Sequence, residues 1–131
     1  MFFRMKHVLI GLTLLLANMS VANADPAQVL ANICTIVQSD DKSGLRKKVK
    51  TMKKDYGLKL AAYYDGISCG GLTLIRYAIK NGSMEAGKFL IKKMSKKALR
   101  APQKDSVTEL DWANANHADA PLTAVLAERV G

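Results

Sequence analysis

The stretch TLIRYAIKNGSMEAGKFLIKKM, residues 73–94, decides the fold that we expect for this chain. Residues 72–79 are apolar apart from Thr73 and Arg76, which is typical of a short buried helix. Asn81-Gly82 ends that helix, and Ser83 is predicted to cap a second one that runs to Ala101-Pro102. One face of this second helix carries Met84, Gly87, Ile91, Met94 and Ala98. The stretch therefore predicts a helix hairpin.

The same plan occurs about 42 residues earlier, between Cys34 and Met52. A largely buried first helix follows Asp25-Pro26 and extends to Val37. After a polar turn, Asp41 or Ser43 caps a basic helix that ends near Tyr56-Gly57. Its narrow apolar stripe consists of Leu45, Val49, Met52 and Tyr56. Repeated helix pairs that cannot bury their faces alone are expected to stack.

The remaining segments complete an all-α fold class of antiparallel helix hairpins. Residues 110–130 look like a third, partial copy, with an Ala/Asn-rich turn before a last helix that starts at Pro121. Residues 57–71 are ambiguous, because Asp65-Gly66 and Gly70-Gly71 favour turns while residues 58–64 could be helical. A short extended finger around Asp65-Gly66 is the alternative there.

Two resemblances follow from these motifs. Residues 73–85 are similar to the core of an ankyrin repeat, and Ala120-Pro121-Leu122-Thr123 resembles a weaker second start, so ankyrin-like stacking is possible. Leu74 stands where that repeat prefers proline, and the period is too long. The chain also resembles a bacterial domain-of-unknown-function family of small exported proteins, through Ile33-Cys34, residues 40–43 and Cys69-Gly70-Gly71. This second resemblance implies an envelope location and no activity.

Residues 1–24 are predicted to be a cleavable secretory signal peptide. Arg4 and Lys6 precede an apolar run over residues 8–17, and Ala22 and Ala24 form an Ala-x-Ala cleavage site. An uncleaved membrane anchor is the alternative, although the run is shorter than the roughly 20 residues that a transmembrane helix needs. Cleavage after Ala24 leaves a single small helical domain, residues 25–131, that is periplasmic or secreted and has no transmembrane helix.

Both cysteines, Cys34 and Cys69, remain after cleavage. A pair of cysteines in a small exported domain favours one structural disulfide. Two buried free thiols or a redox pair are the alternatives, but the sequence lacks the Cys-x-x-Cys spacing of redox pairs.

The sequence gives little support for a catalytic site or a metal site. Gly66-Ile67-Ser68-Cys69-Gly70 fits the letters of a hydrolase nucleophile elbow, but His117 is the sole histidine after it, and the fold that presents such a serine is much longer. We interpret it as the turn that lets Cys69 reach Cys34. Asp40-Asp41 is expected to cap helices rather than bind calcium. We therefore predict no catalytic residues, no metal site and no cofactor, while a small enzyme without a sequence signature stays open.

The lysine faces are the best candidate for a binding site. The chain has a formal net charge of +9, and loss of the two leader cations reduces it to +7. Candidate anion-binding residues are Lys47, Lys50, Lys54, Lys88, Lys92 and Lys96. A solvated surface without a ligand is the alternative. We do not expect nucleic acid as a ligand, because the lysine faces lack stacking aromatic residues and arginine is scarce.

Aromatic residues offer one more candidate surface, made of Tyr63-Tyr64 and of Trp112 with Leu110. We expect these side chains to be core or edge contacts. The predicted function is that of an exported, non-catalytic module that binds an envelope protein. The alternative is a cationic module that binds anionic lipid or a cell-envelope polysaccharide.

Overall fold

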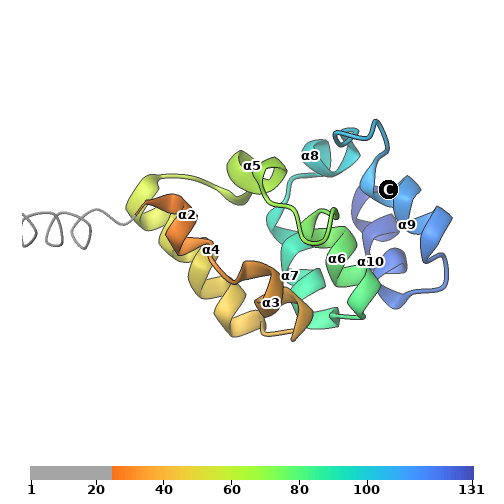
Figure 1. The fold of residues 1–131 in the computed structure, drawn as a ribbon. Coiled ribbons are helices and arrows are strands. Elements are labelled where there is room, and N and C mark those ends of the chain that lie inside the picture. The colour runs from red at the N-terminus through yellow and green to blue at the C-terminus, as the bar shows by residue number, and fades with distance from the viewer. Residues whose placement is uncertain (1–24) are drawn as a thin grey trace, which may run out of the picture. The chain divides into compact units, whose positions relative to one another are not determined.

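The computed structural model describes residues 25–131. The predicted leader, residues 1–24, and His7 within it lie outside the described residues. Among the described residues, those up to Ala31 belong to a different unit from Asn32–Gly131. Within the described residues, every regular element is a helix, so the predicted all-α fold class is confirmed (Figure 1). No helix in that part of the chain combines the length and apolarity needed to cross a membrane.

The predicted first helix is interrupted. Helix α2 covers Pro26–Val29, and Asp25 caps it by accepting a hydrogen bond from the Gln28 amide at 3.1 Å. Helix α3 covers Ile33–Gln38 and begins after Asn32, whose φ of 65° is left-handed and breaks the helical path. The expectation of a continuous, largely buried helix is wrong, since α3 buries only Ile33 and Val37.

Helix α4, Lys42–Tyr56, forms the first hairpin with α3. Asp41 caps it through a 2.9 Å hydrogen bond from the Gly44 amide, and Gly57 ends it at a φ of 68°. The predicted stripe is buried at Leu45, Val49 and Met52 and half-buried at Tyr56. The lysines lie on the other faces of α4, where Lys42 and Lys48 are half-buried and Lys47, Lys50, Lys53 and Lys54 are exposed.

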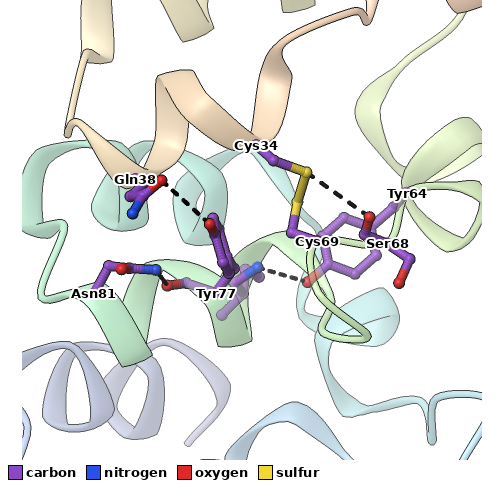
Figure 2. The surroundings of a disulfide bond; sticks show 8 residues. Cys34, Gln38, Tyr64, Ser68, Cys69, Tyr77 and Asn81 are labelled. Atoms are coloured by element: carbon purple, nitrogen blue, oxygen red, sulfur yellow. Dashed lines mark hydrogen bonds between the residues drawn. A yellow bond between two sulfur atoms is a disulfide. The ribbon is translucent and has the colours of Figure 1, made fainter.

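The ambiguous segment contains helix α5, Leu60–Tyr63, and the 3-10 helix η1, Tyr64–Gly66. Next comes a tight turn in which Cys69 and Leu72 form an isolated antiparallel bridge, so no extended finger forms around Asp65-Gly66. Cys69 is bonded to Cys34 of α3, which confirms the predicted disulfide (Figure 2). The carbonyl oxygen of Ser68 lies 3.8 Å from Cys34 Sγ, so the Gly-Ile-Ser-Cys-Gly segment is the turn that delivers Cys69.

The second hairpin consists of α6, Leu74–Asn81, and α7, Met84–Lys93. Thr73 caps α6, and Gly82 ends it at a φ of 67°. Ser83 occupies the predicted N-cap position of α7, but its side chain makes no capping hydrogen bond, because its hydroxyl donates to the Gln38 carbonyl at 3.3 Å. Asp40 of the first hairpin performs that capping by accepting a 2.7 Å hydrogen bond from the Ala86 amide. Both carboxylates of Asp40-Asp41 thus act as caps.

The predicted long second helix stops early. Met94 is extended, and Ser95 caps a new helix, α8, Lys96–Arg100, by accepting from the Ala98 amide at 3.0 Å. Ala98 consequently leaves the predicted face of α7 and is half-buried. The Ala/Asn-rich segment is helix α9, Glu109–Asn116, rather than a turn, and α10 covers Pro121–Val130.

Within the Asn32–Gly131 unit the hairpins stack in chain order (Figure 1). Helix α3 packs on α6 and α4 on α7, and α6 and α7 pack in turn on α9 and α10. Gly87 allows α7 to approach α10 closely, because a Cβ at this position would collide with Leu122. Ankyrin-like character of this stacking stays a prediction. For function, the decisive contact is that of α4 with α7, which brings the two basic helices together.

Candidate functional site

A cationic groove lies along the contact between α4 and α7. It has two compartments, which we call the wide compartment, about 760 Å³, and the narrow compartment, about 500 Å³. Arg46 of α4 and Phe89 and Lys93 of α7 line both compartments, so the two compartments adjoin at these side chains. The ammonium of Lys93 lies 5.7 Å from the centre of the Phe89 ring, a cation–π distance.

The narrow compartment is lined by cations above an apolar floor. Val49, Leu60 and the shared Phe89 form the floor, and each is at most 8% exposed. Apart from the shared Arg46 and Lys93, the cations are Lys50, Lys53, Lys54 and Lys59. No carboxylate lines this compartment. Its walls therefore attract negative charge, while its floor suits an apolar group.

The wide compartment is mixed in charge. Its own cations are Lys42, Lys88, Lys92, Lys96 and Arg129. Two carboxylates, Glu85 at the start of α7 and Glu128 near the end of α10, line it as well. Ile91 and Val125 supply apolar surface. This end of the groove is still cationic, but less uniformly so.

The groove cations have no carboxylate partner within the described part of the chain. Both ion pairs that the structure records among residues 25–131 belong to Arg76, which lines neither compartment. Lys50 and Lys54 are four residues apart on one helix, as are Lys88 and Lys92, and like charges at that spacing repel by about 0.2–0.5 kcal/mol. The cations thus lower helix stability, and an external anion would relieve that repulsion.

The structure places most of the predicted anion-binding lysines in the lining of the groove. Lys50 and Lys54 line the narrow compartment, and Lys88, Lys92 and Lys96 line the wide one. Lys47 is exposed on α4 and lines neither. That these residues bind an anion stays a prediction.

Sequence reasoning missed other groove residues, among them Arg46, Lys53, Lys59, Phe89, Lys93 and Arg129. A signal existed for two of them, since Arg46, Lys50 and Lys53 are spaced four and three apart on one helical stripe. Lys59 and Arg129 could not be found this way, because they come from segments outside the two basic helices.

Comparison with protein families decides where this chain belongs. A family described as a protein of unknown function, DUF3718, matches residues 33–101, more than half of the chain. The chain belongs to the DUF3718 family. The predicted resemblance to a family of unknown function is thereby confirmed. No curated protein and no solved structure matches.

The DUF3718 region contains the disulfide and both basic helices. Cys34, Cys69, α4 and α7 all lie within residues 33–101, and the narrow compartment is lined wholly from this region. Val125, Glu128 and Arg129 of the wide compartment come from α10, beyond the matched residues. The all-cationic part of the groove is therefore the part that belongs to the family domain.

A buried polar network joins the DUF3718 region to the C-terminal helices. Arg76 Nε donates to Glu109 Oε1 at 2.7 Å, and its Nη1 donates to Asp105 Oδ2 at 2.6 Å. Tyr64 and Thr73 donate their hydroxyl hydrogens to Glu109 Oε2. Glu109 and Arg76 are 1% and 5% exposed, so each neutralises a charge that would be costly to bury alone.

The network shifts the ionisation of its members. Burial and then the charge of Glu109 hold the pKa of Tyr64 well above its usual value. The hydrogen bond from Arg76 lowers the pKa of the Asp105 carboxyl. The first shift keeps Tyr64 a neutral hydrogen-bond donor and the second keeps Asp105 charged, so we assign the network a structural role.

The aromatic residues that the sequence offered as a candidate surface are buried or half-buried. Tyr64 is buried, and Tyr63 is half-buried, with a hydroxyl oxygen that is enclosed without a hydrogen-bond partner. Trp112 and Leu110 are half-buried, and the Trp112 ring lies near Arg76 and near His117, with its centre 5.4 Å from the centre of the His117 ring. Within residues 25–131 no three metal-ligating side chains lie close enough to hold an ion.

Proposed function

We propose that this protein is an exported, non-catalytic binding module that holds an acidic segment of an envelope protein in the groove between α4 and α7. The observation that carries the proposal is the gathering of cations from two helices around one groove without carboxylate partners among residues 25–131. Acidic side chains would supply the missing counter-charge and steer the encounter.

The shape and floor of the groove favour a protein partner over the other anions. Phe89, Val49 and Leu60 offer an apolar floor to side chains that a polysaccharide lacks. A flat bilayer surface would contact exposed cations outside the groove, such as Lys47, rather than a groove between two helices. An acidic protein segment with interspersed apolar residues matches both the walls and the floor.

The proposed location rests on two supports. The disulfide between Cys34 and Cys69 is of the kind that persists in oxidising compartments. Residues 1–24 have the sequence pattern of a cleavable leader. We therefore propose a periplasmic or secreted protein. The proposal is non-catalytic because Ser68, the residue with the best catalytic motif, belongs to the disulfide turn.

The test compares three probes on the purified protein with its disulfide intact. They are an acidic peptide with interspersed leucines, a soluble acidic polysaccharide, and vesicles rich in phosphatidylglycerol. We expect the peptide to bind most tightly and to weaken as the Debye length shortens to about 8 Å at physiological salt. Tighter binding of the polysaccharide or the vesicles would overturn the protein-partner proposal in favour of that ligand.

A matched pair of charge variants assigns the binding to the groove. The groove variant is Lys50→Glu, Lys54→Glu and Lys92→Glu, and the control is Lys47→Glu, Lys80→Glu and Lys97→Glu, three exposed lysines outside the groove. Both change the net charge equally. Because an exposed ion pair contributes about 0.2–1 kcal/mol, we expect the loss of three pairs to weaken peptide binding by roughly 3- to 150-fold in the groove variant. Equal losses of peptide affinity in both variants would show that the groove is not the binding site.

A further inference from the structure

The narrow compartment of the groove offers hydrogen-bond donors but no side-chain acceptor. Its polar lining consists of lysine and arginine side chains, which carry N–H groups and no acceptor atom. Its other lining side chains, Val49, Leu60 and Phe89, are apolar. A ligand in this compartment can therefore present carboxylate or carbonyl oxygens, but a backbone N–H group turned towards the lining finds no side-chain partner.

This lack of acceptors bears on the backbone conformation of a partner segment. An extended segment exposes its N–H groups and, when it docks on a protein, commonly pairs them with a sheet edge. Every regular element within residues 25–131 is a helix, so the described chain offers no strand edge. A helical segment hydrogen-bonds most of its N–H groups internally and turns side chains outward. The narrow compartment thus favours a helix over an extended chain.

Apolar lining continues through both compartments. Val49 and Leu60 lie in the narrow compartment, Ile91 and Val125 lie in the wide one, and Phe89 lines both. Cations from α4 and from α7 line each compartment as well, and in the wide compartment they outnumber the two carboxylates. A ligand that spans the groove therefore gains most from an apolar face with acidic side chains on both of its flanks.

The length of the groove fits about three turns of helix. Lys42 of α4 lines the wide compartment, and Lys54, 12 residues further along the same helix, lines the narrow one. At about 1.5 Å per residue these two positions are about 18 Å apart. A partner helix of this length, with apolar residues three and four positions apart, would present one continuous apolar face to the groove.

From the donor-only lining and the continuous apolar lining we infer that the partner segment docks as an amphipathic α-helix, with its apolar face on Phe89 and its carboxylates directed at the cations on either side. The inference rests on the proposed function and specifies the conformation of its ligand. Helix-in-groove recognition uses apolar anchors at positions i, i+3, i+4 and i+7. The groove therefore selects the spacing of apolar residues as well as negative charge.

Two acidic peptides of identical composition, made of glutamate, alanine and leucine, test the inference. In the helical-period peptide the leucines stand at positions i, i+3, i+4 and i+7, and in the alternating peptide they stand at every second position. Both carry the same charge and the same summed helix propensity, so a difference in affinity reports the leucine spacing. Titration of the purified protein with its disulfide intact should show roughly tenfold tighter binding of the helical-period peptide, the contribution of about one buried leucine. The Cα chemical shifts of that peptide, isotope-labelled, should become helical in the complex.

Val125→Ala tests whether the apolar face of the helix lies in the groove. Val125 is half-buried on α10 and lines the wide compartment, so alanine removes apolar contact with the ligand. We expect the affinity for the helical-period peptide to fall by about fourfold, the contribution of one buried methylene group. Val130→Ala is the matched control, because Val130 is a half-buried valine of the same helix that lines neither compartment.

The outcomes separate the inference from the proposed function. If neither peptide binds, the proposed function fails and the inference fails with it. If the alternating peptide binds at least as tightly, or the bound helical-period peptide does not become helical, the groove holds acidic segments without selecting a helix, and the inference alone is overturned. Equal losses in Val125→Ala and Val130→Ala would also contradict an apolar face in the groove. Tighter binding of the helical-period peptide, with helical shifts and a loss confined to Val125→Ala, supports the inference.

Discussion

Asp40 lies in the turn between α3 and α4, but its carboxylate serves the second hairpin. Its backbone is left-handed, with a φ of 58°, and in this conformation Oδ1 accepts the Ala86 amide hydrogen at 2.7 Å. Ser83, which occupies the N-cap position of α7, donates its hydroxyl hydrogen back to Gln38. Both hydrogen bonds are donated by the second hairpin and accepted by the first, and together they fix the register of the two hairpins.

We expect Asp40→Ala to lower the free energy of unfolding by about 1–2 kcal/mol, because an N-terminal amide of α7 loses its cap and alanine strains the left-handed backbone. Urea denaturation measures the change. Asp40→Asn is the matched control, since asparagine keeps an acceptor oxygen and tolerates this backbone, and it should lose less. Equal stability of Asp40→Ala and the wild type would contradict the cap.

Tyr63 and Tyr64 predict how stability responds to alkali. Burial raises the pKa of Tyr63 to about 12, and burial with the charge of Glu109 holds that of Tyr64 well above 10. Below pH 10 both rings are protonated in the folded and unfolded chains, so their contribution is fully present. Above pH 10 the unfolded chain releases these protons first, so the free energy of unfolding should fall as pH rises from 10 towards 12.

Tyr63→Phe tests this dependence cleanly. The Tyr63 hydroxyl oxygen is buried without a hydrogen-bond partner, so its removal should leave stability at neutral pH unchanged or slightly higher. The alkaline loss of stability should become shallower, because one tyrosine no longer contributes. Urea denaturation at neutral pH and across pH 10–12 measures both, and an unchanged alkaline slope would contradict the shifted pKa of Tyr63.

At the scale of elements, the disulfide connects α3 to the turn before α6. Cys34 and Cys69 are 35 residues apart, and closing a loop of this length stabilises the fold by about 4 kcal/mol on the chain-entropy model. We expect the double variant Cys34→Ser and Cys69→Ser to lose stability of this order in urea denaturation. Reduction of the wild type should cause the same loss and add the mass of two hydrogens.

The double variant supplies its own control, because a reductant should no longer change its stability. A wild type whose mass stays the same on reduction would contradict the bond. A loss well below 1 kcal/mol would mean that the denatured chain already keeps the two segments close.

The elements that the sequence predicts well are those with an apolar period. The stripe of α4 at Leu45, Val49 and Met52 is buried as expected, because four- and three-residue spacing leaves one face for the core. Helix α9 has no such stripe, since its buried residues are Glu109 and Ala113. Glu109 can be buried only because Arg76, from α6, neutralises it, and that long-range pairing is invisible in a local pattern.

The sequence pattern also does not predict two of the helix boundaries. The left-handed Asn32 divides α2 from α3, and the Ser95 cap divides α7 from α8. Both residues are tolerated within a helical pattern, so propensity alone did not mark them as boundaries. At Ser83 the sequence context predicts a capping side chain that the structure does not have. The carboxylate of Asp40 accepts the hydrogen bond from the Ala86 amide of α7 instead.

For the whole molecule, stacking creates a property that neither basic helix has alone. The sequence predicts lysines on α4 and on α7, but not that the two helices pack together and share one groove. Arg129 reaches the groove from α10, where its Nη2 donates to the Met94 carbonyl at 2.9 Å. The positive electrostatic potential of the groove therefore depends on how the helix hairpins stack.

This concentration of cations predicts that an anion stabilises the fold through the groove, whatever the natural partner is. Tripolyphosphate at ten times its dissociation constant should raise the free energy of unfolding by about 1.4 kcal/mol, which corresponds to a Tm increase of roughly 4–8 °C for a domain of this size. Scanning calorimetry at constant ionic strength measures it. The variant Lys50→Glu, Lys54→Glu and Lys92→Glu should lose most of this increase, yet start from an equal or higher Tm because like-charge repulsion is relieved. The control variant Lys47→Glu, Lys80→Glu and Lys97→Glu should keep the increase, since its lysines lie outside the groove. The same increase in both variants would mean that the anion acts through general screening, and the groove would then be no more than a solvated surface.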